Sequence, residues 1–208
     1  YNPRKSQPES WRSAPVRAIV LAGGYAKRMG QLATELPKSL LPVAGRPAIE
    51  YIMERLNEIA VVKILLTTNL KFESAFRSWV AKKGLVNTEL VVEQSRSEKD
   101  KLGAVGALAE LTPKLEPDDY LVICGDNIFN SSLRGMVDYY QRKRKPVVAV
   151  YYQTSLDEVK AGSAVTLGED NRIIDFQEKP KNPRTKLAGA CIYLLPFNSL
   201  LRTRQYLD

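Results

Sequence analysis

The 208-residue sequence contains no histidine, only two cysteines and no long run of apolar residues. Without histidine, acid–base catalysis by imidazole and histidine-ligated zinc are both excluded. No apolar stretch approaches the roughly 18 residues that a membrane-spanning helix needs, so no membrane span is expected. Cys124 and Cys191 each lie inside an apolar stretch. This placement predicts two separate, buried and reduced thiols, as in a cytoplasmic protein.

The first 15 residues are polar, contain prolines and lack the apolar core of a signal peptide. We expect residues 1–15 to be a leader or a disordered segment. The remaining residues have no internal repeat and no convincing linker. With 44% hydrophobic and 26% charged residues, the composition is typical of a soluble globular protein. We therefore expect one domain, formed by residues 16–208 around a single core.

Positive charge is concentrated in the first half of the chain, although the net charge of +8 belongs to the whole. Residues 1–104 contain 17 lysines and arginines against 10 acidic residues, and residues 105–208 contain 14 against 13. A nucleic-acid binder would have this asymmetry, and so would a pocket for phosphorylated small molecules. The basic run from Arg142 to Lys145 ends a predicted helix, where it complements the helix dipole and faces solvent. A nucleic-acid partner is therefore not expected.

Strand-like apolar runs alternate with helix-like segments along most of the chain. The predicted strands cover 16–22, 61–69, 88–94, 119–127 and 146–153. The predicted helices cover 47–59, 72–84, 105–113 and 131–145, the last with a serine cap. This alternation of Val/Ile/Leu-rich runs with helices is typical of a mostly parallel sheet that is covered on both faces.

The alternation changes after Gln153. Two apolar runs around Glu-Asp-Asn predict a β-hairpin over 163–180, and a further strand over 187–196 precedes a last helix over 197–207. We therefore predict the α/β class, with a Rossmann-like three-layer sandwich, a mostly parallel but mixed central sheet and a single domain.

A glycine pair follows the first predicted strand, in the sequence LAGGYAKRM. In an open parallel sheet, ligands bind beyond the carboxyl ends of the strands, where this turn must lie. Gly23 and Gly24 let backbone N–H groups approach a phosphate, while Arg28 and Lys38 offer positive charge. The turn matches neither a P-loop nor the dinucleotide-binding fingerprint. A tight turn with two solvated basic residues would have the same local sequence.

Three further motifs are individually weak. Asp126 follows an apolar strand in CGDN, a position suited to a Mg²⁺ ligand and equally to a turn residue. Gly103 and Gly106 precede and enter a predicted helix, where a flat base could approach the backbone. Glu178 and Lys179, in the sequence EKP, pair a hydroxyl acceptor with a cation, as many charged turns also do.

Taken in series, these motifs resemble the sugar nucleotidyltransferase (nucleoside-diphosphate-sugar pyrophosphorylase) family. The resemblance covers about Val16 to Pro196. Its most specific parts are LAGGYAKRM, LPKSLLPVAGRPAIEY, LGAVGAL, CGDN and EKP, which occur in the family's order.

The resemblance implies a Mg²⁺-dependent transfer of a nucleotidyl group from a nucleoside triphosphate to a sugar 1-phosphate, with pyrophosphate as the second product. The attacking phosphate is already ionised, so no general base is required, and positioning and charge neutralisation carry the rate. The implied catalytic residues are Arg28, Lys38 and Asp126, and Asp126 is also the metal ligand. The implied nucleotide contacts are Leu21, Ala22, Gly23, Gly24, Gly103 and Gly106. The implied sugar-phosphate contacts are Gly162, Glu178 and Lys179.

The expected partners are therefore a nucleoside triphosphate and a sugar 1-phosphate, with a homo-oligomer left open. The sequence departs from the family pattern at Gly189-Ala190-Cys191, on the sugar side, where the family has Asn-Ala-Gly. The resemblance also implies a second metal carboxylate, which has no match before Asp208. Two alternatives remain: a non-catalytic regulatory domain with the same nucleotide pocket, and cytidylyl or guanylyl transfer to a non-sugar phosphate such as phosphocholine.

Overall fold

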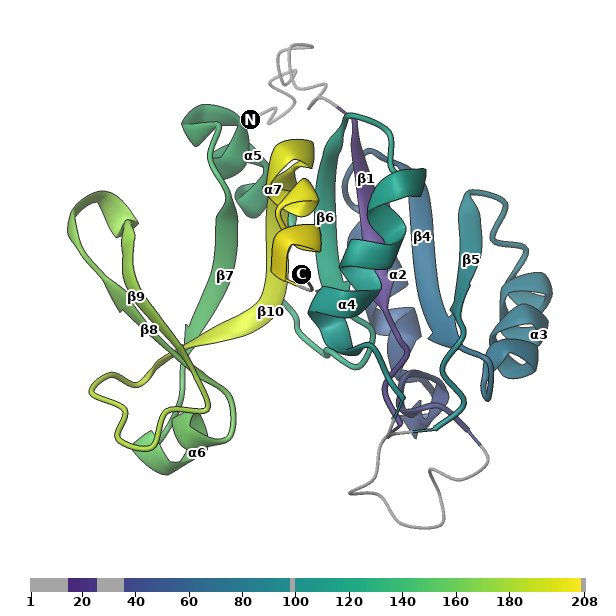
Figure 1. Cartoon of the computed structure of the whole chain (residues 1–208), viewed down its shortest axis with the longest axis horizontal. Coiled ribbons are helices and arrows are strands. Elements are labelled where there is room, and N and C mark those ends of the chain that lie inside the picture. Colours follow the sequence, from purple (N-terminus) through teal and green to yellow (C-terminus); the bar gives the residue numbers. More distant parts are fainter. Residues whose placement is uncertain (1–14, 26–35, 98–99, 207–208) are drawn as a thin grey trace, which may run out of the picture.

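A six-stranded sheet forms the centre of the structure, a computed structural model that describes residues 15–25, 36–97 and 100–206 (Figure 1). The strand order is β5-β4-β1-β6-β10-β7. Strands β5, β4, β1 and β6 pair in parallel, whereas β10 runs antiparallel to both β6 and β7. The strands are β1 (Val16–Leu21), β4 (Val61–Asn69), β5 (Thr88–Glu93), β6 (Asp119–Cys124), β7 (Val147–Tyr152) and β10 (Leu187–Pro196). The predicted mostly parallel, mixed sheet is confirmed.

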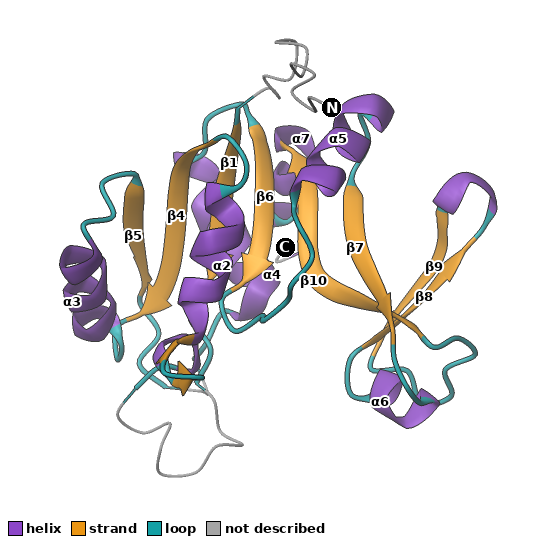
Figure 2. Cartoon of the chain, turned by 180° about the vertical axis from the view of Figure 1, so that it is seen from behind, coloured by secondary structure: helices purple, strands orange, loops and turns teal. Residues whose placement is uncertain are grey.

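Helices cover both faces of the sheet, as Figures 1 and 2 show from opposite sides. One face packs against α2 (Ala48–Asn57), α3 (Glu73–Lys83) and α5 (Arg134–Lys143). The other packs against α4 (Gly103–Leu111) and α7 (Phe197–Leu201). In β1, Ala18 and Val20 belong to the first core and Ile19 to the second, because neighbouring side chains of a strand point to opposite faces. The three-layer sandwich is therefore confirmed.

A second, smaller sheet lies beside the central one. It consists of the hairpin β8 (Ser163–Leu167) and β9 (Ile173–Glu178), which follows the short helix α6 (Leu156–Lys160). The hairpin is held to the central sheet where the Gly189 N–H donates to Ser163 Oγ at 3.0 Å. Every residue of β9 is exposed. A two-stranded ribbon, β2 (Pro42–Val43) with β3 (Arg46–Pro47), follows the 3₁₀ turn Lys38–Leu40.

Several predicted helix limits differ from the structure. Helix α5 begins at Arg134 without a side-chain cap, so the serine cap predicted for 131–145 is wrong, although Ser132 Oγ accepts the Arg134 N–H at 3.3 Å. Helix α6 was not predicted; it is short, and Ser155 caps it by accepting the Glu158 N–H. The last predicted helix ends at Leu201 and gives way to a 3₁₀ turn, Arg204–Tyr206. Remaining 3₁₀ turns are Thr112–Lys114 and Glu169–Asn171.

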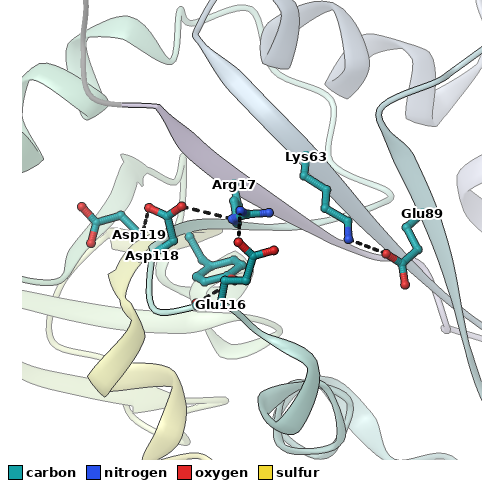
Figure 3. A network of polar contacts seen from close by, with 7 residues as sticks. Arg17, Lys63, Glu89, Glu116, Asp118 and Asp119 are labelled. Carbon is teal, nitrogen blue, oxygen red and sulfur yellow. Dashed lines mark hydrogen bonds and ion pairs between the residues drawn. The ribbon is translucent and has the colours of Figure 1, made fainter.

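Ion pairs join the strands at the end of the sheet where β1 begins (Figure 3). The Arg17 guanidinium contacts the carboxylates of Glu116 and Asp118, in the latter case at 3.1 Å, and its side chain is only 16% exposed. Lys63 of β4 pairs with Glu89 of β5 at 2.6 Å. These contacts join β1 to the segment before β6, and β4 to β5.

Across the described ranges, no helix has both the length and the apolar character that a membrane crossing demands.

We predict that Leu121→Ala destabilises the fold by roughly 2–5 kcal/mol, because its side chain is fully buried in a central strand and truncation leaves a cavity. Val86→Ala, at a side chain that is 99% exposed, should change the free energy of unfolding by less than about 0.5 kcal/mol. Urea unfolding of the two variants and the wild type measures both values. Equal effects would contradict the placement of Leu121 in the core.

Candidate functional site

A cavity of about 640 Å³ opens at the carboxyl ends of the parallel strands. It contains most of the residues singled out from the sequence, although they come from separate parts of the chain. The predicted residues that line it are Leu21, Ala22, Gly23, Gly24, Lys38, Gly103, Asp126 and Lys179. Gly106, Gly162 and Glu178 do not line it, and Arg28 lies outside the described residues.

The glycine turn after β1 is fixed by its neighbours in the sheet. The Ala22 N–H donates to the Thr67 carbonyl at 3.0 Å, and the Asn69 side-chain amide donates to the Gly23 carbonyl at 3.0 Å. A Cβ at Gly23 would lie 2.6 Å from Glu93 Oε1, whereas a Cβ at Gly24 would meet nothing within 4 Å. Gly23 therefore packs closely against the Glu93 carboxylate, whereas the space beside Gly24 is open.

Lys38 and Asp126 form an ion pair at the cavity. Asp126 follows Gly125, whose N–H donates to the Leu21 carbonyl at 2.7 Å, so the β6 loop lies directly against the glycine turn. A Cβ at Gly125 would lie 2.9 Å from Ser39 Oγ, next to Lys38 in the chain. Two of the three predicted catalytic residues are thus brought together. Each remains partly exposed, Lys38 at 48% and Asp126 at 36%, and so accessible to a ligand.

Lys179 reaches the cavity from the β8–β9 hairpin. Its N–H donates to the Gly162 carbonyl at 2.7 Å, and its φ of +45° turns the chain just after β9. Gly162 precedes β8 and Glu178 ends β9, so both lie next to Lys179, but neither lines the cavity. Of the three predicted sugar-phosphate contacts, the structure therefore places only Lys179 at the site.

The two glycines near α4 have different surroundings. Gly103 has a φ of +71°, a left-handed conformation that glycine adopts without strain, and it lines the cavity. Gly106 is buried inside α4, and a Cβ there would lie 2.9 Å from Leu102 Cβ. Helix packing therefore accounts for Gly106, and the structure does not bring it to the cavity that was expected to hold the base.

Glu93 is the most informative residue that the sequence reasoning missed. It ends β5, lines the cavity and is only 7% exposed. The Ser95 hydroxyl donates to its Oε1 at 3.0 Å. Burial raises the pKa of Glu93 above the ordinary 4.5, and the nearby Glu110 and Asp100 carboxylates raise it further. The signal was present, because Glu93 ends an apolar strand much as the Gly-Asp of Asp126 does.

Further lining residues were also not predicted, and most of them are small or uncharged. They are Tyr25, Ser39, Thr67, Lys101, Ala104, Ala107 and Cys124. Lys101 precedes α4 and adds a third lysine to the wall, beside Lys38 and Lys179. The cavity is therefore basic, with two carboxylates, Glu93 and Asp126, among its described lining residues.

The prediction of two separate, buried thiols is wrong. Cys124 is half-buried at the cavity wall and Cys191 is exposed. Cys124 and Cys191 each lie one residue beyond the paired Ile123 and Ile192, on neighbouring antiparallel strands. The interaction between the two thiols lowers the pKa of Cys191 to about 7 and raises that of Cys124.

Within the described ranges, no three acidic or cysteine side chains gather into a group that could hold a metal ion without a substrate. Asp126 is a single carboxylate at a basic wall. Mg²⁺ is commonly held by one or two carboxylates together with substrate phosphates, and this donor set fits only that mode of binding. The magnesium expectation stays a prediction.

Residues 17–207 match the family model described as nucleotidyl transferase. The chain belongs to the nucleotidyl transferase family. A mannose-1-phosphate guanylyltransferase of Mycobacterium tuberculosis is 29% identical over 91% of this chain and 51% of its own. A glucose-1-phosphate adenylyltransferase of Clostridium beijerinckii is 25% identical over 88% of this chain and 50% of its own. The chain thus spans about half the length of these relatives.

A solved structure supports the fold of this nucleotidyl transferase family member. A UDP-glucose pyrophosphorylase from Acinetobacter baumanii aligns with a TM-score of 0.73 over 90% of this chain and 76% of its own, at 17% identity. Both the family and the fold class that the motifs predicted are confirmed. The roles of individual residues stay predictions.

The buried Glu93 predicts a pH dependence of stability. The pKa of Glu93 is raised in the folded state. Its contribution to folding stability is therefore complete below the ordinary glutamate pKa of 4.5 and is lost as pH rises through the raised value. Glu93→Gln has no such charge, so the Tm of this variant minus the Tm of the wild type should increase from acidic to neutral pH. Thermal unfolding across that range measures the difference. A constant difference would contradict the raised pKa.

Proposed function

We propose that the chain is the nucleotide-binding and catalytic domain of a sugar-1-phosphate nucleotidyltransferase. In this reaction a phosphate oxygen of the sugar 1-phosphate attacks the α-phosphorus of a nucleoside triphosphate. A new P–O bond forms, the bond from the α-phosphorus to the bridging oxygen breaks, and pyrophosphate leaves. The observation that carries the proposal is the single cavity in which the glycine turn, the start of α4 and three lysines converge.

The order of strands supports an arrangement of the substrates across the cavity. Glu93 ends β5, Gly23 follows β1, and Asp126 follows β6, so these residues succeed one another across the sheet. Lys179 comes from the hairpin beside β10, on the far side of Asp126. We place the base near Glu93, the phosphates between Lys38 and Asp126, and the acceptor phosphate near Lys179.

The chain's own groups suit this chemistry without an acid–base residue. Lys38 and Lys179 neutralise phosphate charge from opposite sides, and neutralisation of charge that develops in a transition state is worth several kcal/mol in a water-poor site. Arg28 remains the proposed grip on the triphosphate tail. Mg²⁺, with Asp126 as the protein's ligand, would supply further neutralisation when bound with the triphosphate.

Glu93 favours guanine as the base. An ionised carboxylate only accepts hydrogen bonds, and guanine presents two adjacent donors, N1–H and the exocyclic amino group. The corresponding edge of adenine presents one donor and one acceptor. The Mycobacterium relative, named as a guanylyltransferase, agrees with this choice, whereas the Clostridium relative, named as an adenylyltransferase, makes ATP the necessary comparison.

We predict that Lys38→Ala and Asp126→Asn each lower kcat/KM by about 100- to 1000-fold, the scale of losing one preorganised charge contact. Release of pyrophosphate from the triphosphate and a panel of sugar 1-phosphates, with and without Mg²⁺, measures this effect. Arg142→Ser, which removes an exposed charge at the end of α5, is the control and should retain full activity.

Wild-type kcat/KM in either variant would remove that residue from the reaction. Binding of triphosphate without any release of pyrophosphate would favour the regulatory-domain alternative. Turnover with phosphocholine and with none of the sugar 1-phosphates would favour cytidylyl or guanylyl transfer to a non-sugar phosphate.

We also predict that GTP is preferred and that Glu93→Gln lowers the GTP/ATP ratio of kcat/KM by roughly tenfold, because one buried hydrogen bond is worth about 1–3 kcal/mol. Glu169→Gln is the matched control, since Glu169 is exposed and does not line the cavity. A ratio that is unchanged in Glu93→Gln would place the base elsewhere.

A further inference from the structure

Cys124 and Cys191 lie on neighbouring antiparallel strands, each one residue beyond the last recorded pair. That pair is Ile192 with Ile123, and Tyr193 with Val122 precedes it. Regularly paired residues of such strands have Cα atoms about 4.5–5.5 Å apart, within the range of about 4.4–6.8 Å that disulfides span. The Asn127 side-chain amide donates to the Cys191 carbonyl at 3.5 Å, so the segment after Cys124 contacts Cys191 itself. The two thiols also shift each other's pKa, in agreement with this placement.

The two thiols differ in accessibility. Cys191 is exposed and has a φ of +53°, at the place where the pairing of β10 with β7 shifts register between Gly189 and Tyr193. Cys124 is half-buried and lines the cavity. An oxidant in solution can therefore reach Cys191 first, and the second sulfur lies beside it.

The surrounding loop holds this pair close to the proposed phosphate site. The Asn127 side-chain amide donates to the Ala190 carbonyl at 2.7 Å, which joins the segment after β6 to the bulge of β10. Asp126 lies two residues after Cys124, and Cys124 and Asp126 both line the cavity. The thiols thus lie beside the loop that carries Asp126.

We propose that Cys124 and Cys191 form a reversible disulfide that switches off use of the triphosphate at this cavity. The oxidant is a low-molecular-weight disulfide such as oxidised glutathione. The Cys191 thiolate attacks one of its sulfurs and releases one glutathione thiolate. The Cys124 sulfur then attacks the Cys191 sulfur, releasing the second glutathione. The protein loses two electrons and two protons, and the oxidant becomes two thiols.

The expected effect on the cavity follows from geometry. Cys124 lines the cavity two residues before Asp126, so a bond to Cys191 changes the side chain that the wall presents beside the proposed phosphate site. The bond would also fix the end of β6, and with it the loop that carries Asp126, to the bulge of β10.

The disulfide itself is tested without any substrate. The chain is incubated with oxidised glutathione or with dithiothreitol, its free thiols are alkylated, and its intact mass and unreduced peptides are measured. We expect two alkyl groups on the reduced protein, none on the oxidised protein, and one peptide pair linked through Cys124 and Cys191. Glutathione left on Cys191, or covalent dimers instead of the internal link, would overturn the proposal.

The switch is tested on the same samples, and this part rests on the proposed function. Oxidation should lower release of pyrophosphate by about tenfold or more, and dithiothreitol should restore it. Cys191→Ser should respond to oxidised glutathione by less than about twofold, because Cys124 alone cannot form the link. Unchanged turnover in a fully linked protein would overturn the switch.

Failure of the proposed function would look different. If the reduced protein releases no pyrophosphate, the proposed reaction is wrong, while alkylation still decides whether the disulfide forms. The switch is then measured as loss of triphosphate binding on oxidation, with Cys191→Ser again as the control. Equal binding by the reduced and linked forms would overturn it.

Discussion

Strand β1 is hydrogen-bonded in parallel on both sides, and the cavity depends on this pairing. Its register places Leu21 beside Thr67 of β4 and Cys124 of β6, so β1 and β6 end at one level and β4 ends two residues later. The loops that follow them are forced together, as the short bond from the Gly125 N–H to the Leu21 carbonyl illustrates. Residues more than 100 positions apart in sequence therefore meet without any local signal that they should.

Charge balance is the second constraint on the cavity. Its lysines would repel one another at a wall this small, and Asp126 offsets part of that repulsion by pairing with Lys38. Partly exposed ion pairs contribute little to stability, so the pair can be exchanged for ligand contacts at low cost. A bound phosphate would replace Asp126 as the partner of Lys38, and the cation that accompanies it would replace Lys38 as the partner of Asp126. The ion pair therefore suits a ligand that brings both charges.

Much of this could be predicted from the sequence because the signals are local and periodic. The apolar strands, the glycine turn and the Gly-Asp after β6 follow from short patterns, and the order of motifs identified the family. Glu93 was missed because many strands end in a carboxylate. Only the strand order, which places β5 two strands from β1, shows that this one lines the cavity. The contact of Cys191 with Cys124 depends on the antiparallel return of β10, which no short pattern encodes. Gly106 was wrongly assigned to the nucleotide site because the sequence does not show whether a helical glycine faces a ligand or, as here, a leucine.

The outer strand of the β8–β9 hairpin, β9, belongs to neither hydrophobic core and is exposed along its whole length. The protein's stability therefore depends little on the identity of β9 residues, while the turn after β9 still delivers Lys179 to the cavity. On the proposed function, the acceptor side is built on a part that can change without unfolding the rest. Such modularity would let a lineage exchange one acceptor for another by small steps, while the nucleotide side, tied to the centre of the sheet, stays the same.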